Sequence, residues 1–456
     1  MKNCGEAFEI YTFLEVSLMQ FSEEVKLTLW NLIDKMSEDL SQFTVNPNRD
    51  FTRKKKWDFP TLIKFIISME SQSLKNELHK YFGYTVDCPT NASFNQRRSQ
   101  VKSDAFKHLF EEFTATYNNN PSLFKGYRIL ACDGSDVNIA RNPKDEDTYF
   151  TQEKAKGFNQ LHLNAMYDLL DRIYTDIIIQ PARKENEHKA FCDMVDRYIG
   201  EEKAIFIVDR GYESYNNLAH VMEKNAFFVF RCKDINSSGI LSGFKQKLPD
   251  TEEFDTTLSL ILTRKWTNEV LNHPEIYRRF RNKDSFEFLD LDEHAYYNMT
   301  LRVLRFPISE TEYECVITNL PAEDFSAKEI KKLYAMRWGI ETSFRELKYA
   351  VGLTSFHAKK RQYIIQEIWA RLILYNFCEI ITAHVSISKC TKKHTYQINY
   401  TFAIHICRYF ISKMAEKSPP DVEALIGKEI LPVRPGRHDP RKVYPKKAVS
   451  FLYRVA

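Results

Sequence analysis

The alternation of apolar and polar positions divides the chain into a helical beginning, a mixed middle and a helical end. Residues 1–125 show helical periodicity over three long stretches, at 8–45, 59–82 and 101–117, so we expect a helical N-terminal region. Residues 126–233 instead alternate short apolar runs with helical stretches. In chain order these are strands at 127–132, 157–170 and 172–182, a helix at 185–200, a strand at 204–208, a helix near 213–224 and a strand at 227–232. This order predicts an α/β fold with a mixed sheet and helices on both faces.

A β-rich segment is expected to interrupt this sheet domain. Within residues 234–322 the pattern favours strands at 256–264, 286–291, 297–306 and 313–318. The sheet domain should be completed by a helix within residues 323–362. Residues 363–456 then form a helical C-terminal region, with helices at 363–385 and 400–415 and a Pro- and Arg-rich basic tail.

Residues 331–353, KKLYAMRWGIETSFRELKYAVGL, have the pattern of one helix with an apolar flank. At about 100° per residue, a stripe roughly 60° wide collects four polar side chains, with a fifth beside it. The four are Tyr334, Arg337, Glu341 and Lys348, and the fifth is Arg345. A carboxylate among cations at the edge of a buried flank suits an acid that holds a metal against a nucleic-acid backbone. An ordinary amphipathic helix, with Glu341 paired to Arg337 and Arg345 at i±4, is the alternative.

Two aspartates directly follow the most apolar predicted strands. Asp133 lies in ILACDGSD and Asp209 in IFIVDRGY. Side chains at strand ends project into the crevice where such sheets bind ligands, although an Asp at a strand-to-turn junction can also be structural. Gly134 directly follows Asp133 and Gly211 lies two residues after Asp209, and each glycine permits a tight turn or a close backbone approach. Together with Glu341 these aspartates could hold two divalent ions for phosphoryl transfer on DNA, and without metal their mutual repulsion should raise their pKa values.

Composition restricts the class of protein. A chain of 456 residues is long enough for two or three domains. Nine Cys without any Cys-x-x-Cys pair argue against a disulfide framework or a structural zinc site and fit the cytoplasm. The first residues lack the pattern of a signal peptide. The most apolar stretch, 368–387, contains Arg371, Glu379 and His384, so we interpret it as a buried helix.

Charge is concentrated in a few places, although the formal net charge is only +4. Residues 434–454 carry seven Lys or Arg against one acid, and residues 53–56 form a second basic cluster. In PTNASFNQRRSQVKSDAFKHLFEEF a helical module could lay Arg97, Arg98 and Lys102 against DNA. A plain helical hairpin with a solvated surface is the alternative. The motifs of P-loop NTPases, His-Glu-x-x-His metalloproteases and Gly-x-Ser-x-Gly hydrolases are all missing from the sequence.

Three motifs together resemble one known family. The spacing Tyr334-x2-Arg337-x3-Glu341-x6-Lys348 resembles the Tyr-Arg-Glu-Lys signature of the family-four insertion-sequence transposases, which are DDE enzymes with an RNase H-like core. Asp133-Gly134-Ser135 and Asp209-Arg210-Gly211-Tyr212 resemble the first and second Asp motifs of that family. The resemblance spans about residues 90–365 and includes the β-rich interruption.

The resemblance implies roles for individual residues. Asp133, Asp209 and Glu341 would be the catalytic metal ligands, for Mg²⁺ or for Mn²⁺ in its place. Phosphates at the transposon end would be contacted by Tyr334, Arg337 and Lys348, with Arg345 and Arg210 as further contacts. In relatives an insertion-domain Trp stacks near a flipped base. Trp266 is the only Trp between 234 and 322, but its surroundings do not follow the family pattern, and we interpret it as a core residue.

The resemblance also implies a reaction and its partners. The chain would bind the terminal inverted repeats of a bacterial insertion sequence, cut them through a hairpin intermediate, and join them to target DNA as a homodimer. A catalytically silent DNA-binding protein with the same fold and an RNase H-like nuclease are the alternatives. The three intact acids argue against the first, and the Tyr-Arg-Glu-Lys helix with its large interruption argues against the second.

Overall fold

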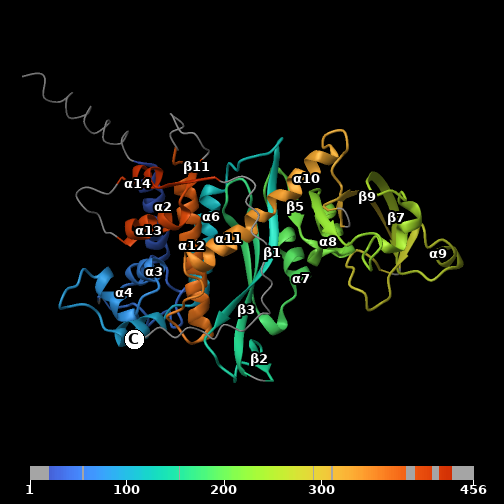
Figure 1. The fold of residues 1–456 in the computed structure, drawn as a ribbon. Coiled ribbons are helices and arrows are strands. Elements are labelled where there is room, and N and C mark those ends of the chain that lie inside the picture. Colours follow the sequence, from blue (N-terminus) through green and yellow to red (C-terminus); the bar gives the residue numbers. More distant parts are fainter. Residues whose placement is uncertain are drawn as a thin grey trace, which may run out of the picture. The chain divides into compact units, whose positions relative to one another are not determined.

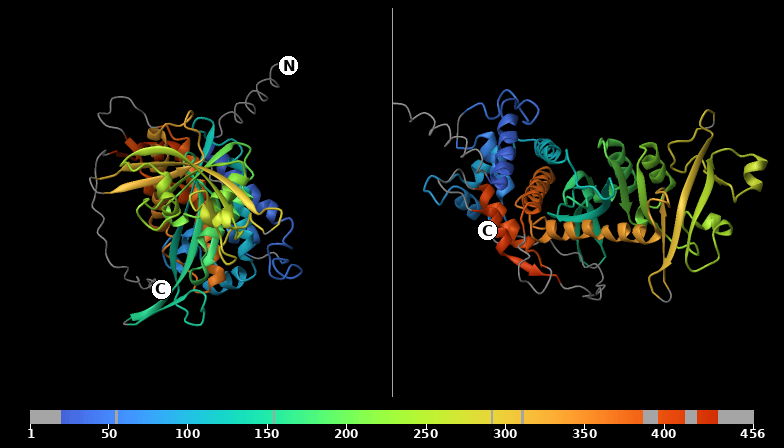
Figure 2. Two further views of the ribbon diagram at one scale, coloured as in Figure 1. Left: turned by 90° about the vertical axis from the view of Figure 1, so that its right-hand side faces the viewer. Right: turned by 90° about the horizontal axis from the view of Figure 1, so that it is seen from above.

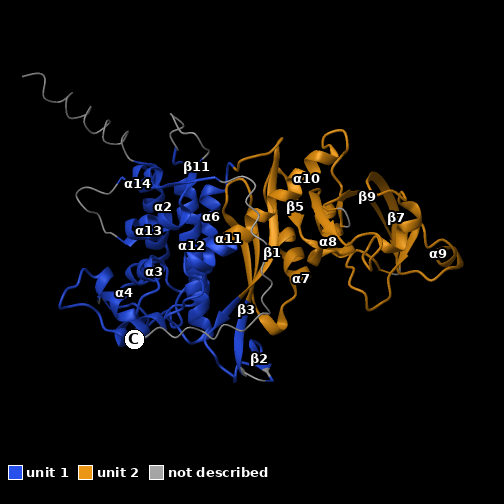
Figure 3. Ribbon diagram, viewed as in Figure 1, with its two compact units in different colours: residues 1–120, 137–161, 344–456 blue, residues 121–136, 162–343 orange. Residues whose placement is uncertain are grey.

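The computed structural model describes residues 20–53, 56–153, 155–290, 292–309, 312–386, 396–412 and 421–433 (Figure 1). The basic tail 434–456 and two lysines of the 53–56 cluster therefore lie outside the described residues. The chain forms two compact units, coloured separately in Figure 3. Unit 1 comprises residues 1–120, 137–161 and 344–456, and unit 2 comprises residues 121–136 and 162–343.

Unit 1 is mainly helical and combines both ends of the chain. Its elements are α2 (Phe21–Met36), α3 (Phe59–Ser68), α4 (Leu74–Tyr81), α5 (Asn91–Arg98), α6 (Ser103–Tyr117), α12 (Arg361–Ala383), α13 (Tyr400–Ser412) and α14 (Val422–Lys428), with the short pair β11 (Tyr396–Ile398) and β12 (Ile430–Pro432). Helix α12 packs against α6, α3, α13 and α2 and is buried along nearly its whole length. The prediction of a buried helix within 368–387 is thus confirmed as far as Ala383, where α12 ends; residue 387 lies outside the described residues. None of the described helices is long and apolar enough to cross a membrane.

A single large sheet carries the predicted α/β core. Its strands are β1 (Tyr127–Ile139), β2 (Tyr149–Gln152), β3 (Ala155–Asp168), β4 (Tyr174–Pro181), β5 (Lys203–Val208), β6 (Phe227–Cys232), β7 (Phe254–Thr263), β8 (Tyr277–Arg279), β9 (Tyr296–Pro307) and β10 (Tyr313–Thr318). The spatial order is β2-β3-β1-β5-β6-β10-β9-β7-β8, and β4 pairs with β3. Strands β1, β5 and β6 are parallel, whereas β10 is antiparallel to β6. The predicted RNase H-like mixed sheet is therefore confirmed.

Alternate residues of the central strands of unit 2 face opposite helical layers. Phe206 packs with the helices α7 (Glu187–Arg197) and α8 (Tyr215–Glu223) on one face. Its neighbour Ile207 packs with α10 (Ala327–Met336) on the other face. Because both faces are covered, β5 is apolar and buried from Ala204 to Val208, as expected for a buried parallel strand.

The β-rich segment extends the core sheet at β6. Strand β10 pairs with β6, and β9 and β7 follow it outward in unit 2 (Figure 2). One predicted strand in this segment, 286–291, is wrong. The Arg264 guanidinium donates hydrogen bonds to the carbonyls of Asp284, Phe286 and Leu289, so these backbone groups are satisfied without a strand partner.

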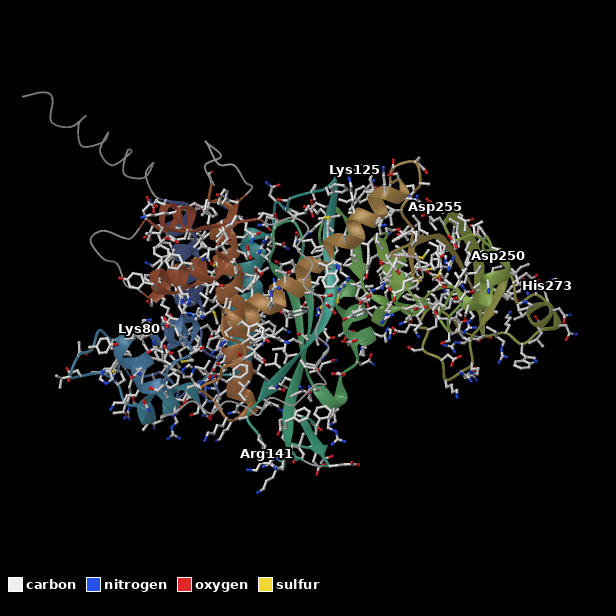
Figure 4. All side chains as sticks on the ribbon, in the orientation of Figure 1. Lys80, Lys125, Arg141, Asp250, Asp255 and His273 are labelled. Atoms are coloured by element: carbon white, nitrogen blue, oxygen red, sulfur yellow. The ribbon has the colours of Figure 1, made fainter. Side chains whose placement is uncertain are left out.

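The predicted helix 331–353 is built from two segments. Helix α10 ends at Met336 and α11 (Trp338–Tyr349) follows, separated only by Arg337, whose backbone remains helical at φ −50°, ψ −30°. A capping box of Ser326 and Glu329 starts α10. Lys125, which is labelled in Figure 4, forms an ion pair with Glu329, with its Nζ 2.5 Å from the carboxylate. Hydrogen bonds from Lys125 and Ser326 lower the pKa of Glu329 to about 2. These contacts fix the start of the helix that carries Tyr334 and leads to Glu341.

Candidate active site

Asp133 lies inside β1, not at its end. The strand continues to Ile139, so the prediction that it stops before Asp133 is wrong. The Asp133 Oδ1 accepts a hydrogen bond from the backbone N–H of Gly134 at 2.9 Å. The pKa of Asp133 is raised to about 6, mainly by burial. The Gly134 N–H and Arg337 oppose this shift, and the carboxylates of Glu341 and Asp209 add to it.

Asp209 directly follows β5 and has a different environment. Its Oδ1 accepts hydrogen bonds from the Arg210 backbone N–H at 2.7 Å and from the Tyr334 hydroxyl at 3.1 Å. The Arg231 guanidinium lies 3.5 Å from the same oxygen. Burial acts to raise the pKa of Asp209, but the Arg210 N–H, Arg337 and Arg231 together lower it below its usual value. The expectation of a raised pKa is therefore confirmed for Asp133 and wrong for Asp209.

The Arg337 side chain connects the remaining acids. Its Nη2 donates to the Glu341 Oε1 at 2.8 Å, and its Nη1 lies 3.6 Å from the Asp133 Oδ2. Two acids from separate segments thus flank one guanidinium, and Asp209 is close enough to contribute to its electrostatics. Arg337 is only 3% exposed, and its Nε has no hydrogen-bond partner among the described residues.

This arrangement fits a divalent cation by its donor set. Three carboxylates offer the hard oxygen ligands that Mg²⁺ and Mn²⁺ prefer. A buried guanidinium with an unsatisfied Nε now supplies the positive charge that these acids require, so it acts as a stand-in cation. These are the residue types of a metal-dependent phosphoryl-transfer site, but in this structure the three carboxylates do not form a group close enough to share one ion, and Arg337 lies between Asp133 and Glu341.

Two residues near Asp209 were missed by sequence reasoning. Arg231 on β6 approaches Asp209, and its Nε lies 3.9 Å from Glu314 on β10. Burial raises the pKa of Glu314, and Arg231 partly opposes this. Neither residue belongs to a recognisable motif, and the two meet only because β10 pairs with β6.

A second charged cluster surrounds His162 on β3. The Nδ1 atom lies 2.9 Å from Asp136 and 3.1 Å from Glu185, and the Nε2 atom lies 3.1 Å from Glu187. Burial would lower the pKa of His162, but hydrogen bonds to Asp136 and Glu187 raise it to about 9. Among the described residues, Asp136, His162 and Glu185 alone form a group that could share one metal ion. The protonated imidazole offsets part of the negative charge of the carboxylates around it.

Gly134 makes the close backbone approach that the sequence suggested. A Cβ at this position would lie 2.5 Å from the His162 Nε2 and 2.3 Å from the Glu187 Oε1. Any larger residue beside Asp133 would therefore displace the His162 cluster.

The predicted DNA contacts fall into distinct environments. Arg210 is exposed beside Asp209, and Tyr334 and Arg337 lie at the acids, as described above. Arg345 is exposed and Lys348 is half-buried on the part of α11 that belongs to unit 1. Arg97 and Lys102 are half-buried in unit 1, where the Lys102 Nζ donates to the Gln42 carbonyl at 3.1 Å.

The prediction that Arg98 contacts DNA is corrected by the structure. Its side chain is only 2% exposed, and its Nη1 pairs with the buried Glu367 at 2.8 Å. Its Nε donates to the Gln366 side chain at 2.9 Å. Arg98 therefore joins α5 to α12 inside unit 1.

The interpretation of Trp266 as a core residue is also wrong. Trp266 is 67% exposed, and the Arg279 guanidinium lies 3.6 Å from the centre of its ring. This stacking satisfies one face of the indole at the surface.

Fold and site together define a class of enzyme: an RNase H-like sheet with three carboxylates, suited to metal-dependent phosphoryl transfer. The family model described as the transposase DDE domain matches residues 124–377, more than half of the chain, and the chain therefore belongs to that family. It is a DDE transposase, an enzyme of divalent-metal-dependent phosphoryl transfer on DNA.

No curated protein matches the sequence. Among solved structures, the chain is similar to the piggyBac transposase in a cryo-EM structure of its synaptic complex with hairpin DNA, at 10% identity and a TM-score of 0.47. That match covers 91% of this chain and 87% of the other.

Proposed function

We propose that this chain is the transposase of a bacterial insertion sequence, acting in the cytoplasm on the terminal inverted repeats of its own element. The observation that carries the proposal is the meeting of Asp133 and Glu341 at the two ends of the Arg337 guanidinium, with Asp209 beside them. A catalytically silent DNA-binding protein would not need to keep three acids around one cation. A nuclease without sequence preference would not need the Tyr-Arg-Glu-Lys helix.

The acids would hold the divalent ions, for which we propose Mg²⁺ or Mn²⁺. When bound, such ions activate the attacking oxygen and stabilise the leaving oxygen in phosphoryl transfer. Tyr334 donates to Asp209 and so fixes its orientation. Arg337 is close enough to bind a phosphate presented at the acids, which would replace the carboxylates as its partners.

The proposed reaction proceeds in four steps. Water attacks the phosphorus at the transposon end, and the bond to the 3′-oxygen breaks, which leaves a 3′-OH and a 5′-phosphate. That 3′-OH attacks a phosphorus of the opposite strand, and the bond from this phosphorus to the 3′-oxygen of the flanking DNA breaks. This forms a hairpin on the transposon end and releases the flanking DNA with a 3′-OH. A second water attacks the hairpin phosphorus, and the bond to the transposon 3′-oxygen breaks, which restores the 3′-OH and leaves a 5′-phosphate. The restored 3′-OH then attacks a phosphorus of the target DNA, and the target strand leaves with a 3′-OH.

DNA would be positioned by contacts that carry no sequence information. We propose that the phosphates of the transposon end contact Tyr334, Arg337, Lys348, Arg345, Arg210 and Lys102. Two ends have to be cut and joined together, so we propose that the chain acts as a homodimer.

The test separates DNA binding from chemistry. Asp133→Asn and Glu341→Gln should each abolish cleavage of a duplex that carries the terminal repeats that flank the gene, and should leave its binding within about threefold, because metal ligands do not read sequence. Glu323→Gln is the matched control, since Glu323 is an exposed acid of the same unit. Denaturing gels detect nicked and hairpin products, and gel shifts report binding.

Metal binding supplies a second readout. Mn²⁺ should raise the melting temperature of the wild-type protein and of Glu323→Gln, but not that of Asp133→Asn. Equal loss of binding and cleavage would mean that the acids hold the fold together. Cleavage of duplexes with scrambled ends at the same rate, without hairpins, would support the nuclease alternative.

A further inference from the structure

A polar pocket of about 390 Å³ opens on unit 1 between the loop 46–53 and α5. Three arginines line it, Arg49, Arg53 and Arg97, and the described side chains that complete the lining are amides and a hydroxyl, among them Asn48, Thr52 and Gln100. Every one of these side chains can donate a hydrogen bond, and none is acidic. The lining therefore has the chemistry of an anion site.

The loop is folded so that its acid points inward and its arginines point outward. The backbone N–H groups of Arg49 and Asp50 both donate to the Asn46 carbonyl, at 3.0 and 2.9 Å. Asp50, the only acid between residues 46 and 53, is 3% exposed, and its carboxylate accepts from the Asn46 N–H at 2.8 Å. Phe51 has a φ of 57°, which is rare for a bulky residue and often accompanies a functional constraint.

The third arginine is held in place before any ligand binds. The Arg97 Nη1 donates to the Gln100 side chain at 3.0 Å, and the guanidinium lies 5.3 Å from the centre of the Phe51 ring. The Val45 N–H donates to the Gln100 carbonyl at 2.9 Å, which joins the loop to the end of α5. No ion pair to a described carboxylate engages any of the three arginines, so their charge is available to an anion.

We propose that this pocket binds the phosphodiester backbone of the DNA on which the transposase acts, an inference that rests on the proposed function. Guanidinium forks match phosphate oxygens, and the flanking amides and hydroxyl add donors. Small-molecule sites are concave and mostly apolar and bury most of their ligand. This pocket is polar, and its lining is largely exposed, which suits a polymer that passes across it.

The test is the salt dependence of duplex binding. In Arg49→Gln/Arg53→Gln/Arg97→Gln the slope of log K against log salt should fall by about two to three, since each phosphate contact contributes about 0.9. The variant should lose the same amount of binding affinity for repeat-containing duplexes as for scrambled duplexes. The control Lys35→Gln/Lys75→Gln/Lys107→Gln removes the same charge from exposed positions of α2, α4 and α6, and should change the slope by less than about one.

Several outcomes are distinguishable. An unchanged slope in the arginine variant, with wild-type binding intact, overturns this inference alone. Failure of the wild-type protein to bind or cut the repeat duplex overturns the proposed function. Tight binding of pyrophosphate that the arginine variant loses, without a change in DNA binding, would make the pocket a small-anion site and overturn the inference. If the triple glutamine variant unfolds, Arg49→Lys/Arg53→Lys/Arg97→Lys takes its place. This lysine variant should keep the salt slope and bind DNA at least threefold more weakly. Unchanged affinity would overturn the inference.

Discussion

At the scale of single residues, burial and neighbouring cations together make the two aspartates of the proposed active site differ. Asp133 is half-buried with one guanidinium at 3.6 Å, and its pKa rises to about 6. Asp209 has two arginines and a phenol nearby, and its pKa falls. The sequence presents both as an Asp after an apolar run, so this difference follows from neighbours that only the fold supplies.

His162 should make stability depend on pH. Its folded pKa of about 9 lies above the value of about 6.5 for an unfolded chain. The stabilisation is therefore complete below about pH 6.5 and is lost as the pH rises through about 9. We expect the free energy of unfolding to fall by up to about 3 kcal/mol over this window.

The measurement is urea unfolding of wild type and His162→Gln at pH 6, 7.5 and 9.5. The variant should be less stable at pH 6 and should lose less stability than the wild type as the pH rises. Parallel curves for the two proteins would show that the imidazole does not carry the effect.

At the scale of elements, the sequence predicted those whose pattern is set by burial. Alternate residues of β5 face two helical layers, which produces a short, fully apolar run that is recognisable without a structure. The stretch 286–291 also contains buried apolar residues. Arg264, which directly follows β7, donates hydrogen bonds to the carbonyls of Phe286 and Leu289, so this stretch does not pair as a strand. The prediction that Arg98 contacts DNA was wrong for a similar reason, because its ion-pair partner Glu367 lies 269 residues away in the sequence.

The Arg98–Glu367 pair should therefore control stability and not DNA binding. The Glu367 carboxylate is fully buried and also accepts from the backbone N–H groups of His357 and Ala358 at 2.9 and 3.0 Å. Although burial opposes ionisation, Arg98, His357 and Arg371 hold the pKa of Glu367 far below its usual value. Arg98→Met would leave this buried charge without its main partner, at a cost of about 3–5 kcal/mol.

The adjacent residue supplies the control. Arg97→Met should cost only about 1 kcal/mol, because the half-buried side chain loses one hydrogen bond to Gln100 and leaves no buried charge unpaired, while it weakens DNA binding. Chemical denaturation and salt-dependent gel shifts separate the two effects. A stable Arg98→Met protein with weakened DNA binding would reverse the assignment of the two arginines.

At the scale of the whole molecule, each compact unit draws on separate stretches of the chain. Helix α11 begins in unit 2 with Glu341 and ends in unit 1 with Lys348, and β1 and β3 also cross the boundary. The chemistry predicted from the first and second Asp motifs therefore belongs to unit 2, and the pocket lined by Arg49, Arg53 and Arg97 belongs to unit 1. The proposed catalytic and DNA-binding functions should therefore be removable independently by substitution.

This independence allows a test of the proposed homodimer. A Glu341→Gln chain binds DNA but should not cut, and an Arg49→Gln/Arg53→Gln/Arg97→Gln chain keeps its acids but should bind poorly. If each active site cuts the end bound by its partner, an equal mixture should recover activity that neither variant has alone. Half of randomly formed dimers are mixed and each can cut one of two ends, so we expect about a quarter of wild-type end cleavage. If each active site cuts the end that its own chain binds, the mixture should stay inactive. In a separate measurement, cleavage by wild-type protein diluted below its dimerisation range would show that no dimer is needed.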